Sequence, residues 1–172
     1  DEAAAATVLG VVSTTGWANG DEIVIASTSQ TASQCERRTI STVDSAVQVT
    51  VTAGLTNAHS GTSPTQAEVG NITRNVKIHG IGTNAPSTTT TLQGYIFCAS
   101  LSSVTIRYAQ FYYLGSSTAA KIGISVATTT GAFDMQYCSI VDGWITTSSG
   151  VVFTGGAGSN LVFSNNVTFN IN

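Results

Sequence analysis

Short stretches in which apolar and polar residues alternate recur along the second half of the chain. One set opens with glycine and covers residues 94–97, 123–126 and 150–153, at steps of 29 and 27 residues. A second set covers 76–78, 104–106, 133–135 and 161–163, at steps of 28, 29 and 28 residues. Alternation with a period of two is typical of β-strands that bury one face. The fixed interval, without a helical pattern, predicts a repeat architecture.

The repeat predicts an all-β fold of a particular kind, a right-handed parallel β-helix (solenoid) with rungs of about 28 residues. We expect residues 81–172 to form these rungs and residues 1–80 to form a β domain that supplies the first coils, continuous with them. In each strand of the second set, the first and third residues should point inward. These residues are Val76, Ile78, Val104, Ile106, Phe133, Met135, Leu161 and Phe163.

The first half of the chain shows strand patterns without the repeat. Alternating segments at 22–28, 39–43 and 47–51 predict three strands, with Asp44 and Ser45 as the turn between the last two. This half of the chain should therefore form a β domain of another design.

Side chains between the inward positions should form two outer columns, with neighbours about 4.8 Å apart. One column would hold Lys77, Thr105, Asp134 and Val162, and the next His79, Arg107, Gln136 and Ser164. The chain has few charged residues, and several fall in these columns. We therefore predict a surface that binds an acidic polysaccharide; an ordinary solvated surface is the alternative. The candidate glycan-binding residues are Lys77, His79, Arg107, Asp134 and Gln136.

Composition and charge narrow the function. Only 9% of the 172 residues are charged, and the net charge of −3 comes from scattered residues, so no basic surface for nucleic acid is expected. No apolar run approaches the roughly 18 to 20 residues that span a bilayer. Neither a glycine-rich phosphate loop nor histidines at metal-binding spacing occur, so we expect no cofactor or metal.

Catalytic groups are few in the repeats. A glycosidase needs two carboxylates, and the repeats supply only Asp134 and Asp142. A lyase arrangement can be drawn from His79, Arg107, Tyr108 and Tyr137, but no spacing requires it. No residue is therefore assigned as catalytic, and whether the chain is an enzyme stays open, with the balance against it.

The chain has three cysteines, Cys35, Cys98 and Cys138, so they do not all form disulfides within one chain. In the repeat alignment Cys98 and Cys138 fall in different columns, which favours buried free thiols. One disulfide with a leftover thiol is the alternative.

Two sequons, beginning at Asn71 and Asn166, are candidate sites of N-linked glycosylation. Asn166 also lies in a predicted rung, where it and Asn160, Asn165 and Asn170 would instead form stacked amide ladders at a turn. The sequence leaves both alternatives, glycosylation and a structural amide ladder, open for Asn166.

Four strings carry a family resemblance: WANGDEIVIASTS, CERRTIS, LTNAHSG and AEVGNITRNVKIHG. In order and spacing they are similar to the successive signatures of the G-eight domain, over roughly residues 16 to 80. That extracellular β-rich module occurs in fibrocystin-like proteins and in the cell-migration-inducing hyaluronidase family, where parallel β-helix repeats follow it. The resemblance implies an extracellular or cell-surface location and brings no catalytic residue to this chain.

Two function classes remain. One is a non-catalytic structural or adhesive segment of a large cell-surface or filament-forming protein. The other is a glycan-binding or glycan-cleaving module that resembles the hyaluronidases. Because residues 161–172 open another repeat and no polar cap follows, we also expect either longer native sequence on both sides or end-to-end self-association.

Overall fold

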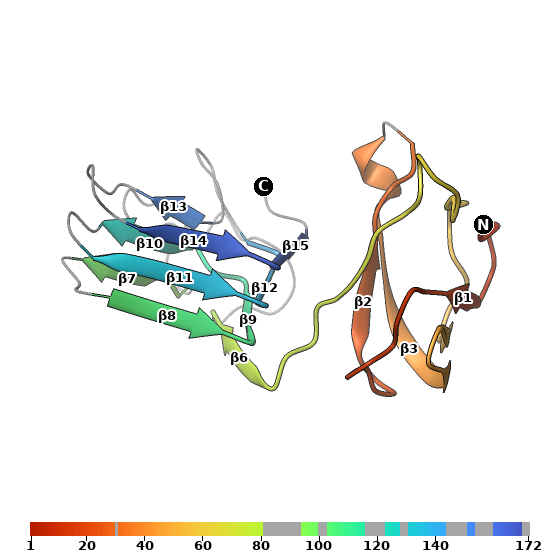
Figure 1. Cartoon of the computed structure of the whole chain (residues 1–172), viewed down its shortest axis with the longest axis horizontal. Helices are drawn as coiled ribbons and strands as arrows, with labels where there is room; N and C mark the ends of the chain where they lie inside the picture. The colour runs from red at the N-terminus through yellow and green to blue at the C-terminus, as the bar shows by residue number, and fades with distance from the viewer. Residues whose placement is uncertain are drawn as a thin grey trace. The chain divides into compact units, whose positions relative to one another are not determined.

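The chain is all-β (Figure 1). The computed structural model describes residues 1–29, 31–80, 94–99, 103–115, 123–127, 131–143, 151–153 and 160–169. Apart from strands, these described residues contain one short 3₁₀ helix, η1 (Ala32–Gln34). The chain divides into two compact units, Asp1–Thr73 and Arg74–Asn172. The first unit has an antiparallel sheet and the second has parallel sheets.

The first unit is built on a five-stranded antiparallel sheet with the order β1-β4-β3-β2-β5. Its strands are β1 (Val8–Gly10), β2 (Glu22–Ile25), β3 (Glu36–Ser45), β4 (Gln48–Val51) and β5 (Val69–Asn71). One cluster of buried side chains forms its core: Leu9, Ile23, Ile25, Ile40, Val49, Val51 and Leu55.

The three strands predicted in this half are confirmed, but the predicted turn is wrong. Asp44 and Ser45 lie within β3, and Ser45 stands opposite Gln48. The turn therefore falls on residues 46 and 47. Register shifts in the β3–β4 pairing let β3 extend past the polar residues that suggested its end.

The second unit contains three parallel sheets. The first consists of β7 (Ile96–Ala99), β10 (Ile124–Ala127) and β13 (Val151–Phe153). The second consists of β8 (Ser103–Arg107), β11 (Ala132–Gln136) and β14 (Leu161–Ser164), whose strands lie side by side in Figure 1. The third consists of β6 (Val76–His79), β9 (Ala109–Tyr112), β12 (Ser139–Val141) and β15 (Val167–Phe169).

The predicted register is confirmed for most of the repeat. Phe133 stands opposite Val104 on one side and Leu161 on the other, and β10 pairs with β13 as predicted. The predicted register of β7 is wrong by one residue, because Ile124 stands opposite Ile96 and not opposite Tyr95. Gly150, the predicted start of one copy, lies outside the described residues. The third sheet, at 109–112, 139–141 and 167–169, was not anticipated from the pattern.

The segment 76–79 was assigned to the wrong sheet. It was expected beside 104–106, but β6 pairs with β9, with Val76 opposite Ala109 and Ile78 opposite Phe111. Val76 and Ile78 stand in register with the core residues Ala109 and Phe111, yet both remain exposed, because β6 is an edge strand of this sheet. The pairing that forms joins residues 33 positions apart, Val76 and Ala109, instead of the 28 that the repeat predicted.

Side chains from all three parallel sheets share one core. Its buried members are Cys98, Ala109, Phe111, Leu114, Ile124, Val126, Phe133, Met135, Cys138 and Ile140, with Ile96, Val104 and Ile106 packed against them. Phe133 and Met135 are inside, as expected. Leu161 and Phe163 stand in register with them but remain 44% and 42% exposed, because β14 is an edge strand with a paired neighbour on one side only.

All three cysteines are free thiols. Cys98 and Cys138 are buried, as predicted, and burial raises the pKa of both. Cys35 is exposed, which corrects the expectation that it is buried.

Residues with left-handed backbone mark the bends between the second and third sheets. Tyr108, Tyr137 and Asn165 have φ of 57°, 57° and 55°, and each stands directly before a strand of the third sheet or its turn. Asparagine tolerates this conformation better than most side chains, whereas a bulky tyrosine adopts it at a cost. The same bend thus recurs in three successive repeats.

Candidate functional site

Three of the predicted binding residues lie together on the solvent-facing side of β8 and β11. Arg107 donates a hydrogen bond to Asp134, and the two form an ion pair across neighbouring strands. Gln136 donates its amide to the other oxygen of Asp134 at 2.8 Å. We call Arg107, Asp134 and Gln136 the outer face. Since Asp134 accepts from both neighbours, the face presents a paired charge rather than a free carboxylate.

The other two predicted residues lie elsewhere. On β6, Lys77 stands opposite Gln110 and His79 opposite Tyr112, in the third sheet. The predicted columns that joined them to Asp134 and Arg107 are therefore wrong. The cause is the sheet assignment of β6, since the outer columns of β8, β11 and β14 match the prediction in register.

A pair of tyrosines, named from the sequence only as part of a possible lyase arrangement, lies next to the outer face. Tyr108 follows Arg107 and Tyr137 follows Gln136, and their rings stack with centroids 5.2 Å apart and planes 10° apart. The rings are exposed, Tyr108 by 59% and Tyr137 by 39%. Arg74 supports the second bend by donating its Nε–H to the carbonyl of Tyr137 at 2.8 Å. The signal in the sequence was a tyrosine repeated at a 29-residue step.

The two sequon asparagines use their side-chain amides inside the fold. Asn71 donates to Asp21 at 2.7 Å and accepts from the amide of Thr73 at 2.8 Å. Asn166 bridges two repeats, because it donates to the carbonyl of Met135 and accepts from the amide of Cys138, at 2.9 and 2.8 Å. Of the alternatives, this favours a structural role for Asn166, although the partners are backbone groups rather than an amide ladder. Asn170 lies outside the described residues.

The first unit contains a buried acid with many donors. Glu36 accepts hydrogen bonds from the backbone amides of Thr56 and Asn57, both at 2.7 Å, and from the side chain of Asn57. It also pairs with Arg38. Burial alone would raise the pKa of Glu36, but the hydrogen bonds from Thr56, Asn57 and His59 outweigh it and lower the pKa to about 2. The carboxylate ties the loop at 54–59 to β3.

His59 is buried beside Glu36, as a residue that braces its loop. Its Nδ1 lies 2.9 Å from the carbonyl of Ala26 and its Nε2 lies 3.0 Å from Glu36. Both ring nitrogens therefore have a hydrogen-bond partner inside the fold. His59 thus joins its loop to Ala26 and to Glu36.

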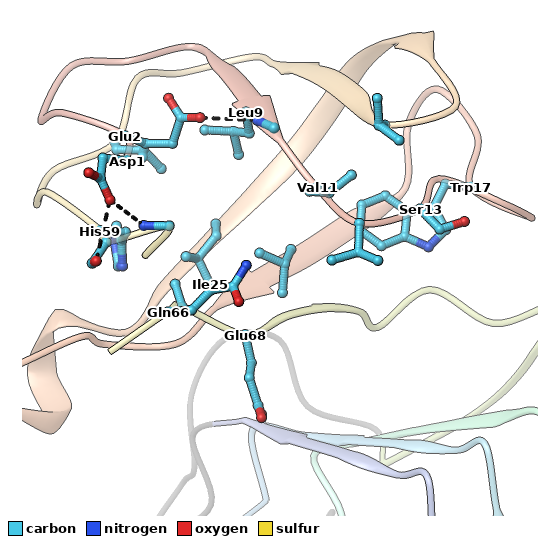
Figure 2. Close-up of a pocket in the computed structure, with 18 residues that line it drawn as sticks. Asp1, Glu2, Leu9, Val11, Ser13, Trp17, Ile25, His59, Gln66 and Glu68 are labelled. Atoms are coloured by element: carbon cyan, nitrogen blue, oxygen red, sulfur yellow. Dashed lines mark hydrogen bonds between the residues drawn. The ribbon is translucent and has the colours of Figure 1, made fainter. Parts of the chain in front are cut away.

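A pocket of about 880 Å³ opens on the same unit (Figure 2). Its lining includes the apolar residues Leu9, Ile25 and Trp17 and, among its polar groups, Asp1 and Glu2. The carboxylate of Asp1 accepts from the amide of Gly61 at 2.6 Å, and that of Glu2 accepts from the amide of Gly10 at 3.1 Å. These carboxylates hold the first residues of the chain against the sheet, which gives them a structural role. The outer face and its tyrosines are the stronger candidate site.

Within the described ranges, no three His, Cys, Asp or Glu side chains gather as a metal site would require. Among those same residues, no helix has the length and apolar character that crossing a membrane takes. No family model matches the chain, and no curated protein matches it.

Proposed function

We propose that the second unit is a right-handed parallel β-helix and that the chain is a non-catalytic structural or adhesive segment of a larger extracellular protein. The observation that carries the proposal is that three parallel sheets, built from successive repeats in register, enclose a single core. A β-helix has this arrangement, because each rung contributes one strand to each sheet.

The order of the two units supports an extracellular role. An antiparallel β unit that contains the strings similar to the G-eight domain precedes the parallel sheets. This is the order that the resemblance implies for fibrocystin-like proteins and the hyaluronidase family. We propose that the segment lies at the cell surface or in a filament, where the two sequons would be exposed to a glycosylation pathway before the chain folds.

The carboxylates of the second unit support a non-catalytic role. Asp134 is neutralised by Arg107 and also accepts from Gln136. Asp142 is buried at a left-handed bend that follows β12, in another sheet. A glycosidase needs an acid that protonates the leaving group and a second carboxylate across the sugar. These environments favour a structural role for both carboxylates over a role in glycoside hydrolysis. The outer face makes glycan binding the second candidate function.

An assay of polysaccharide cleavage tests the proposal. The purified chain is incubated with hyaluronan, pectin and alginate, and both reducing ends and unsaturated products are measured. We expect no release above the blank. Turnover by the native chain that disappears in Asp134→Ala or His79→Ala would overturn the non-catalytic role and establish the hyaluronidase-like alternative.

A further inference from the structure

We propose that the stacked tyrosines Tyr108 and Tyr137, together with Arg107, form a docking platform for the pyranose ring of a neutral polysaccharide. This inference rests on the proposed adhesive role and names the ligand class of the outer face. It replaces the acidic polysaccharide expected from the sequence. Three features of the platform support it: an open aromatic face, a rigid and costly backbone, and a balanced charge.

The open aromatic face belongs to Tyr108. One face of its ring is covered by Tyr137, yet the residue remains 59% exposed, whereas Tyr137 is 39% exposed. At the corresponding position before β6 the chain has Asn75, whose short side chain is itself exposed. The ring face of Tyr108 that points away from Tyr137 is therefore accessible. The C–H groups on one side of a pyranose ring pack well against such a face, because both surfaces are flat and apolar.

The backbone under both rings is costly for tyrosine. Tyr108 and Tyr137 adopt left-handed φ values, and the third repeat places Asn165 at the same bend with nearly the same φ. Asparagine serves the bend with less strain, so folding alone does not account for two tyrosines there. Left-handed residues of this kind concentrate at functional sites. Stacking also holds both rings in place, which reduces the entropy lost when a ligand binds.

The charge balance beside the rings decides the kind of sugar. Arg107 is the one cationic residue in β8, β11 and β14, and Asp134 already neutralises it. Lys77 and His79, which would have attracted a uronate, belong to the third sheet. The side chain of Arg107 remains 42% exposed, and a guanidinium has five N–H donors, so donors are available for sugar hydroxyls. A neutral glycan fits this surface better than an acidic one.

Affinity gel electrophoresis tests the platform. The full chain is run through gels that contain a soluble β-glucan, a galactomannan, hyaluronan or alginate, and the retardation gives an apparent Kd. We expect retardation by at least one of the two neutral polysaccharides, unchanged between low and high salt, and none by the two acidic ones. Because turnover is not involved, failure here would leave the structural role intact, whereas cleavage in the assay above would overturn that role itself.

The key variant is Tyr108→Asn, which removes the ring but installs the residue that the chain itself uses at this bend in the third repeat. It should fold normally by circular dichroism and bind the retarding polysaccharide about fivefold more weakly, the loss expected for one aromatic contact. Tyr108→Phe, which keeps the ring, and Tyr95→Asn, at an exposed tyrosine outside the pair, should bind like the native chain. Equal binding by Tyr108→Asn and the native chain, retardation by the acidic polysaccharides alone, or no retardation at all would overturn the proposal.

Discussion

Replacing the buried Glu36 with glutamine should strongly destabilise the first unit. The carboxylate accepts hydrogen bonds from the amides of Thr56 and Asn57 and pairs with Arg38 and His59. Glutamine keeps the shape but brings two N–H donors toward groups that also donate, so some buried donors lose their acceptor. Loss of one partner of a buried charged network is among the few changes that cost several kcal/mol.

The pKa of Glu36 gives the magnitude. This pKa falls from the ordinary value of 4.5 to about 2 in the folded chain. By linkage this difference corresponds to about 3 kcal/mol of folding free energy that the ionised carboxylate supplies at neutral pH. Because the folded pKa is the lower one, the contribution is complete above pH 4.5 and declines as the pH falls toward 2.

Tryptophan fluorescence during urea unfolding measures this effect. Trp17 packs against the core of the first unit, and a Trp144→Phe background leaves it as the sole tryptophan. In this background Glu36→Gln should lower the free energy of unfolding by about 3 kcal/mol at pH 7. The difference in free energy of unfolding between the two proteins should fall by more than half at pH 3. At that pH the ionised carboxylate of the native protein contributes much less stability.

The exposed Asp44 provides a matched control. It accepts a hydrogen bond from Thr50 on the surface of the same sheet, so Asp44→Asn should change the free energy of unfolding by less than about 1 kcal/mol. A Glu36→Gln variant as stable as Asp44→Asn at pH 7 would refute the reasoning. So would a gap between Glu36→Gln and the native chain that stays constant from pH 7 to pH 3.

Three further predictions concern the second unit. Asn166→Ala should lower the free energy of unfolding in urea by about 2 kcal/mol, because it removes two hydrogen bonds between repeats. Asn160→Ala, at an exposed position, should lower it little, and equal effects would contradict the bridging role. Phe133→Ala should lower the free energy of unfolding by about 4 kcal/mol, because Phe133 is only 1% exposed. Leu161→Ala should lower it by about 1 kcal/mol, because Leu161 is 44% exposed, and the reverse order would mean that the core lies elsewhere. The chain should associate end to end through edge strands such as β14, so its mass by light scattering should rise with concentration, and a monomer at every concentration would count against this.

The sequence by itself determined the class of structure and most of the repeat register. The alternation at 104–106, 133–135 and 161–163 placed three strands side by side, and the parallel pairing follows it residue by residue. Both the alternation and the interval can be read from the sequence alone. In a parallel sheet built from repeats of equal length, corresponding residues of successive repeats stand opposite one another, so these patterns predict the pairs. The outer neighbours Asp134 and Gln136 could therefore be predicted, and so could the inward Phe133 and Met135.

Tertiary structure decided which strands share a sheet and what surrounds each polar group. Val76–His79 has the same alternation as the second sheet but pairs with β9, at a separation of 33 residues that the period of about 28 does not predict. Whether Leu161 is buried depends on the strands beside it and not on its own pattern. The stacking of Tyr108 on Tyr137 and the five donors around Glu36 likewise depend on contacts between distant residues. Hydrophobic alternation carries no record of such contacts, since it reports which face of a strand is apolar and not what that face meets.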